Sequence, residues 1–188
     1  MSQEQWTEIE HYITESVVRP DAALEAALAA SEQAGLPAIN VSPNLGKLLG
    51  LLARAQQARN ILEVGTLGGY STIWMARALP PGGRLITLEI DAKHAEVAAA
   101  NFARAGVEHL IELRLAPALE TLPRLAAEGR GPFDLIFIDA DKPSNPEYFS
   151  WALRLSRPGT MIIVDNVVRG GAVANAASAD ASVQGVRR

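Results

Sequence analysis

The sequence lacks cysteine, long hydrophobic runs and an excess of basic residues. Without cysteine, neither a disulfide framework nor a thiolate metal site can form. No apolar stretch approaches the ~20 residues that a membrane-spanning helix needs, and the polar, acidic start is unlike a secretory signal. The net charge of −4 offers no basic face for nucleic acid. We therefore expect a cytoplasmic protein with neither a membrane nor a nucleic-acid partner.

The 188 residues suffice for one α/β core and are too few for two comfortable domains. Residues 5–17 place apolar side chains at three- and four-residue intervals, which predicts an amphipathic helix. Pro20 and Asp21 open a second, alanine-rich helix that ends at Gly35. Both helices precede any alternation of strands and helices. We interpret residues 1–40 as a helical cap on the sheet, with a dimer surface as the alternative.

The stretch from Asn60 to Ser71 combines a short apolar run, a glycine-rich turn and the start of a helical pattern. Strand, glycine turn and helix open many nucleotide-binding α/β sheets, because glycine lets the backbone lie against a ligand. Dinucleotide-binding loops read G-x-G-x-x-G, whereas here Glu63 precedes Gly65 and the pair Gly68-Gly69. A carboxylate at this position repels a pyrophosphate and suits a cationic or amine-bearing ligand. The alternative is an incidental glutamate in an ordinary strand-turn-helix unit.

Strands and helices alternate through the rest of the chain. We expect strands at 60–64, 84–90, 111–115, 133–138 and 160–164, and helices after Ser42 and at 70–79, 92–105, 118–128 and 146–155. This order predicts a doubly wound, mostly parallel sheet over residues 41–188. Residues 167–180 are expected to form a loop and residues 182–188 the start of a helix. In such sheets, ligands bind beyond the carboxyl ends of the strands.

Glu89 ends the second expected strand, where a carboxylate can accept hydrogen bonds from ribose hydroxyls. A solvated charge at the strand end is the alternative. Glu89 alone does not distinguish an adenosylmethionine enzyme from a nicotinamide oxidoreductase. The glutamate before the glycines favours the former, because it can receive a ligand's ammonium group.

Asp139, Asp165 and Asn166 follow the fourth and fifth expected strands. If these strands are neighbours, their oxygens meet and suit a hard divalent ion such as Mg²⁺ or Ca²⁺. The alternative is that the two acids cap the following helices. Lys142 lies in the same loop as Asp139, and a nearby bound cation would disfavour its ammonium form, so that it could act as a base. A lone loop lysine is otherwise a solvated charge.

From about Ile39 to Ala172 the sequence resembles the cation-dependent small-molecule O-methyltransferases, the group that includes catechol and caffeoyl-CoA O-methyltransferases and bacterial relatives. The matching segments are Leu62–Ser71, Leu88–Asp91, Ala116–Ala118, Phe137–Lys142 and Val164–Val167. Several motifs in family-like order and spacing are far more specific than any single one. The resemblance implies a Rossmann-like methyltransferase fold that uses S-adenosylmethionine.

The resemblance also implies residue roles. The methionine end of the cofactor would be lined by Val41, Glu63, Gly65, Thr66 and Ser71. Glu89 would hold the ribose and Ala118 would flank the adenine. Asp139, Asp165 and Asn166 would bind the divalent cation (Mg²⁺, with Ca²⁺ or Mn²⁺ as alternatives), Asp139 also adjoining the cofactor, and Lys142 would be the base. The implied substrate is a small aromatic vicinal diol, and the implied assembly is a homodimer.

In one respect the sequence departs from the family. Relatives continue with a further helix and two more strands, so we expect the single domain 1–188 to be C-terminally incomplete, without its far sheet edge. The function predicted is methyl transfer from S-adenosylmethionine to a hydroxyl of a catechol-like aromatic. A catalytically silent adenosylmethionine-binding or dimerisation module, and a nicotinamide-dependent oxidoreductase, are the alternatives.

Overall fold

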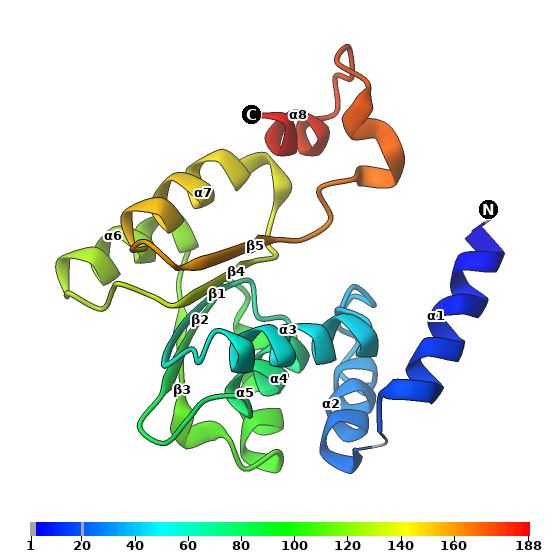
Figure 1. The fold of residues 1–188 in the computed structure, drawn as a ribbon, viewed down its shortest axis with the longest axis vertical. Helices are drawn as coiled ribbons and strands as arrows, with labels where there is room; N and C mark the ends of the chain where they lie inside the picture. The colour runs from blue at the N-terminus through cyan, green and yellow to red at the C-terminus, as the bar shows by residue number, and fades with distance from the viewer. Residues whose placement is uncertain (1–2, 20) are drawn as a thin grey trace.

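The computed structural model describes residues 3–19 and 21–188, and its centre is a parallel sheet of five strands (Figure 1). Their order in space is β3-β2-β1-β4-β5. The strands are β1 (Asn60–Val64), β2 (Arg84–Glu89), β3 (Ile111–Leu115), β4 (Leu135–Ile138) and β5 (Met161–Val164). The order reverses at β1, so the predicted doubly wound parallel sheet is confirmed.

Helices cover both faces of the sheet (Figure 1). One face carries α2 (Ala22–Gln33), α3 (Pro43–Ala55), α4 (Tyr70–Ala76) and α5 (Ala92–Arg104), and the other carries α6 (Ala118–Ala127) and α7 (Asn145–Arg154). The remaining elements are α1 (Gln3–Val17), α8 (Ala181–Arg187) and the 3₁₀ turns η1 (Glu108–Leu110), η2 (Lys142–Ser144) and η3 (Arg169–Ala174). In the described part of the chain, no helix is long and apolar enough to cross a membrane.

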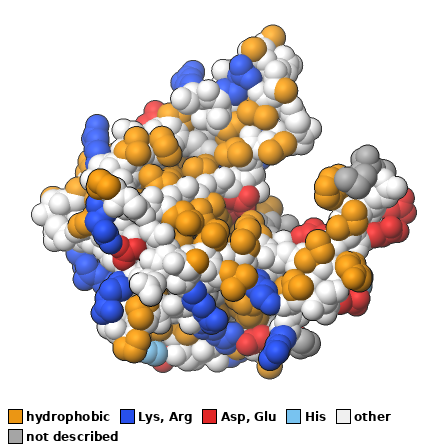
Figure 2. All heavy atoms as spheres, viewed as in Figure 1, with side chains coloured by type: hydrophobic (Ala, Val, Ile, Leu, Met, Phe, Trp, Pro, Cys, Tyr) orange, Lys and Arg blue, Asp and Glu red, His pale blue; other side chains and the backbone are white. Residues whose placement is uncertain are grey.

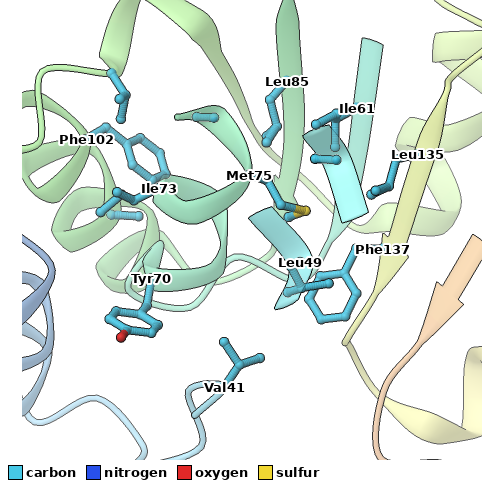
Figure 3. Packing of buried hydrophobic residues seen from close by; sticks show 14 of the residues in the cluster. Val41, Leu49, Ile61, Tyr70, Ile73, Met75, Leu85, Phe102, Leu135 and Phe137 are labelled. Carbon is cyan, nitrogen blue, oxygen red and sulfur yellow. The ribbon is translucent and has the colours of Figure 1, made fainter. Parts of the chain in front are cut away.

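The apolar strands form one hydrophobic layer on each face of the sheet. Successive strand residues point to opposite faces, so Ile61 packs with Met75 and Phe137 in one layer (Figure 3). Leu62 packs with Leu122 and Phe133 in the other. Because both faces are covered, β1 and β4 can be almost wholly apolar and buried. Their rigidity fixes the positions of the loops that follow them.

The expected helix starts have local causes in the structure. The Ser42 side chain accepts from the Leu45 N–H, with proline at the first helical position. Asp21 caps α2 by accepting from Ala23 and Leu24. The prediction that Pro20 also opens this helix falls outside the described residues. In the segment predicted as a cap, α2 packs against α4 and α5, whereas α1 contacts α3.

The C-terminal stretch differs from the prediction. Residues 167–180 were expected to be an irregular loop, but they contain η3. Gly170 and Gly171 have φ of +61° and +90°, so the chain turns tightly here without forming a longer helix. α8 then packs against η2 and α7. Its Gly185 lies so close to the Lys142 carbonyl that an added Cβ would overlap the oxygen.

Candidate active site

A cavity of about 570 Å³ opens at the carboxyl ends of the strands. Its walls come from residues 39–41, 64–68, 88–90, 116–119 and 139–142, together with Asn166 and Arg169. Apart from residues 39–41, which precede α3, these segments follow the strands, as the strand-end rule predicts. On the surface, the molecule is hollowed between α1 and the segment that carries η3 and α8 (Figure 2). The volume is in the range of small-molecule sites.

The glycine turn after β1 is held against the neighbouring strands. The Gly65 N–H donates to the Leu88 carbonyl at 3.0 Å, and the Asp139 N–H donates to the Val64 carbonyl at 2.8 Å. Gly65 has φ of +99°, and an added Cβ would overlap the Asp139 carbonyl oxygen. Only glycine fits here, because both the backbone angle and the close approach exclude a side chain. The turn is thereby fixed beside the start of the Asp139 loop.

Glu89 holds the other side of the same turn in place through hydrogen bonds. Its Oε2 accepts from the backbone N–H groups of Thr66 at 3.2 Å and Leu67 at 2.8 Å. Its Oε1 accepts from Ile90 at 2.9 Å and Asp91 at 3.0 Å. Glu89 lines the cavity, so it is no solvated strand-end charge. The assignment of ribose binding to this carboxylate stays a prediction.

Glu63 lies behind the cavity wall and is not among the lining residues. Its side chain is fully buried and accepts hydrogen bonds from the hydroxyls of Ser71 (2.6 Å), Thr72 (2.5 Å) and Thr87 (2.7 Å). Burial raises the pKa of Glu63 to about 7, and the three hydroxyls oppose that rise. Ser71 does line the cavity. The direct ammonium contact expected of Glu63 therefore has no exposed oxygen to make it, because Ser71 stands between.

Lys142 and Asp139 form an ion pair in the cavity wall. Lys142 Nζ donates to Asp139 Oδ1 at 2.8 Å, and Lys142 is only 8% exposed. The alternative of a solvated loop lysine does not describe such a buried side chain. Both residues follow β4, where the sequence placed them. Their pairing brings a proton-carrying amine to the edge of the predicted cation site.

Asp141, in the same loop, has a different task. It accepts from the Tyr148 hydroxyl at 2.5 Å and from the backbone and hydroxyl of Ser144. Burial opposes ionisation, but these hydrogen bonds hold the pKa of Asp141 below its usual range. Asp141 thus caps η2. Tyr148, which the sequence did not single out, lines the cavity through this contact network.

Asp165 and Asn166 follow β5, the neighbour of β4. Burial and the negative charge of Asp139 raise the pKa of Asp165, and Lys142 opposes that rise. The two carboxylates are therefore close enough to repel each other. Asn166 lines the cavity and has φ of +54°, whereas Asp165 is not among the lining residues and accepts from the Asn166 N–H at 2.6 Å.

The side-chain oxygens of Asp139, Asp165 and Asn166 fit a hard divalent cation. Two mutually repelling carboxylates and an amide oxygen are the ligand types that Mg²⁺ and Ca²⁺ take, and a cation between the acids would relieve their repulsion. Among the described residues, no group of three or more His, Cys, Asp or Glu side chains is placed to hold a metal ion. The cation prediction thus depends on Asp139, Asp165 and Asn166 with solvent completing the shell.

The remaining predicted site residues all reach the cavity. Val41, Thr66, Ser71 and Ala118 line it, from four separate segments. Sequence reasoning missed Leu28 and Ser31 of α2, which also line it. They lie in the segment interpreted as a cap, and nothing in their spacing pointed to a ligand. Arg169 was missed too, although its position three residues after Asn166 was a usable signal.

The model of the family described as O-methyltransferase matches residues 15–188. The chain belongs to the O-methyltransferase family. It is 57% identical over 188 residues to a catechol O-methyltransferase from Niastella koreensis, covering 100% of this chain and 85% of that protein. The prediction of an S-adenosylmethionine-dependent O-methyltransferase is thereby confirmed.

Solved structures of similar proteins agree with this O-methyltransferase in fold. An O-methyltransferase from Bacillus cereus in complex with SAH is 53% identical with a TM-score of 0.96, over 98% of this chain and 84% of that one. The O-methyltransferase TomG from Streptomyces achromogenes, in complex with SAM, is 54% identical with a TM-score of 0.95, over 100% and 84%. These similarities do not support the alternative of a nicotinamide-dependent oxidoreductase.

Proposed function

We propose that this O-methyltransferase methylates a hydroxyl of a small catechol-like aromatic, using S-adenosylmethionine and a divalent cation. The observation that carries the proposal is the group of Asp139, Asp165 and Asn166 beside the buried Lys142 at one end of the cavity. The first relative named above is a catechol O-methyltransferase. Its name supports the choice of acceptor.

The donor half of the cavity is the half between β1 and β2. The methionine end of S-adenosylmethionine would contact the backbone of Gly65 and Thr66 and the hydroxyl of Ser71. Its ribose would contact Glu89. Val41 and Ala118 supply apolar walls, the latter against the adenine. Support comes from the pre-ordered turn, whose N–H groups Glu89 already holds in place. Such a turn loses little freedom on binding.

The acceptor half lies at the ends of β4 and β5. Asp139, Asp165 and Asn166 would hold the cation, which when bound supplies Lewis-acid activation of an acceptor hydroxyl and a fixed orientation for two vicinal oxygens. A rigid arrangement suits the task, because methyl transfer depends on close alignment more than on covalent catalysis by the protein.

Lys142 is the base in this proposal. Its hydrogen bond to Asp139 can be made by a neutral amine, which still has N–H groups to donate. Neutral Lys142 then takes the proton that the acceptor hydroxyl loses. The acceptor oxygen forms its bond to the methyl carbon as the bond from that carbon to sulfur breaks.

Labelled methyl transfer tests the proposal. The protein is incubated with methyl-labelled S-adenosylmethionine and a catechol, a matched monophenol or a resorcinol, each with and without EDTA. We expect label in the catechol alone, lost in EDTA and restored by excess Mg²⁺. Full turnover in EDTA, or equal labelling of the monophenol, contradicts the proposal. The homodimer, the cytoplasmic location and the division into residues 1–40 and 41–188 stay predictions.

A further inference from the structure

The charged side chains of the cavity wall have partners, with one exception. Glu89 accepts four backbone N–H groups, Lys142 pairs with Asp139, and Asp141 accepts from Ser144 and Tyr148. Arg169 also lines the cavity. Within residues 3–19 and 21–188 it has no hydrogen-bond or ion-pair partner. Its guanidinium is the one permanent cation of the described wall that nothing neutralises.

The position of Arg169 distinguishes it from an ordinary surface arginine. It lines the cavity close to Asn166, at the acceptor end. Its φ of +51° is uncommon for a residue with a side chain, and it begins a run of left-handed residues that continues through Gly170 and Gly171. Observed outliers of this kind gather at ligand sites.

An arginine at the acceptor end selects by charge. Guanidinium presents paired N–H donors to a carboxylate or a phosphate and stays charged at all working pH values. A neutral acceptor gains nothing from it. Asp165 and Asp139 lie at the same end, and Lys142 and a cation would offset their charge. An acceptor could then carry an oxyanion group directed away from its reacting hydroxyls, and that group would neutralise the charge of Arg169.

We infer that Arg169 selects catechol-type acceptors that carry an oxyanion substituent, by pairing with that substituent at the mouth of the cavity. The inference rests on the proposed function and names the acceptor class within it. Arg169 is a specificity-determining residue here, since it contacts a part of the acceptor that does not react. The pairing lowers KM for acidic acceptors and leaves the alignment of the reacting oxygen to the groups after β4 and β5.

Three matched acceptors test the inference: 3,4-dihydroxybenzoate, its neutral amide and 3,4-dihydroxyphenylphosphonate. Arg169 is exposed, so in the wild type kcat/KM should favour at least one acid over the amide by about two- to fivefold, as an exposed arginine–oxyanion pair can provide. The acid that is favoured distinguishes a carboxylate from a phosphate-type group. In Arg169→Met the ratio of acid to amide should fall to near one, mainly through KM of the acid. Arg169→Lys should keep an intermediate ratio, because lysine retains the charge without the paired donors.

Arg124→Met is the matched control, since Arg124 is exposed on α6 and pairs only with Glu120 among the described residues. It should keep the wild-type ratio, and thermal melting should show that all variants fold. Equal kcat/KM for the three acceptors in the wild type, or an unchanged ratio in Arg169→Met, overturns the inference and leaves the proposed function intact. Failure of the wild type to methylate any of the three catechols overturns both.

Discussion

Glu63→Gln should change how the stability of the protein depends on pH. The Glu63 carboxyl is fully buried, and its pKa is raised from 4.5 to about 7. In the unfolded chain the same carboxyl is in water and ionises near its ordinary pKa. Each tenfold difference in proton affinity is worth ~1.4 kcal/mol, so the two states differ by roughly 3 kcal/mol. That is a large share of a typical stability of ~5–15 kcal/mol.

The sign follows from which state holds the proton. Below pH 4.5 both states are protonated, and the stability that Glu63 contributes is fully present. Between pH 4.5 and 7 the unfolded state releases its proton while the folded state retains it, so stability falls as pH rises. Above pH 7 both states are ionised and the loss is complete. Glutamine has no proton to release, so this decline should be absent from the variant.

Urea unfolding at pH 5, 6, 7 and 8, followed by tryptophan fluorescence, measures the effect. The difference in unfolding free energy between wild type and Glu63→Gln should move by roughly 2.5 kcal/mol toward the variant from pH 5 to pH 8, because part of the change lies below pH 5. Glu96→Gln is the control, because Glu96 is exposed on α5 and should track the wild type. Parallel pH curves for wild type and Glu63→Gln would show that Glu63 is ionised throughout, and would refute the reasoning.

Three further outcomes are expected. Asp165→Ala should abolish methyl transfer and raise the Mg²⁺ concentration needed for any residual activity, whereas retained turnover with unchanged Mg²⁺ dependence would remove Asp165 from the cation site. Lys142→Met should lower kcat by ~10²–10⁴-fold, the usual contribution of a positioned base, with adenosylmethionine affinity by calorimetry near wild type and partial rescue at high pH; a wild-type kcat at neutral pH would contradict it. Gly65→Ala should destabilise the protein by more than ~2 kcal/mol in thermal melts, because a Cβ would overlap the Asp139 carbonyl. Gly106→Ala is the control: Gly106 has φ of +68° and open space around it, so this change should cost only ~1 kcal/mol.

Much of the framework was predictable because it depends on short-range rules. The apolar run 61–64 followed by glycines could only be a buried strand and a tight turn, and the structure has both. Parallel strands bring their carboxyl ends to one edge, so Asp139 and Asn166 could be placed together without coordinates. These inferences needed the order of elements along the chain and nothing about their packing.

What the sequence could not give depends on side-chain packing in three dimensions. Glu63 has the spacing of a ligand-binding carboxylate, but whether its oxygens face a ligand or neighbouring hydroxyls depends on Ser71, Thr72 and Thr87, from two other elements. Ser31 reaches the cavity only because α2 packs against α4 and α5. Arg169 enters the wall through a left-handed turn that composition alone describes as loop.

The close approach of Gly185 to the Lys142 carbonyl makes the position of the lysine turn depend on the C-terminal helix α8. The segments that form the donor half lie before residue 120, whereas the turn that carries Lys142 packs against α8. If the acceptor binds as proposed, substitutions in η3 and α8 should alter acceptor choice more than S-adenosylmethionine binding. A protein built in this way can acquire new substrates by changes near its C-terminal end. It cannot do so through position 185, where any side chain would displace the lysine turn itself.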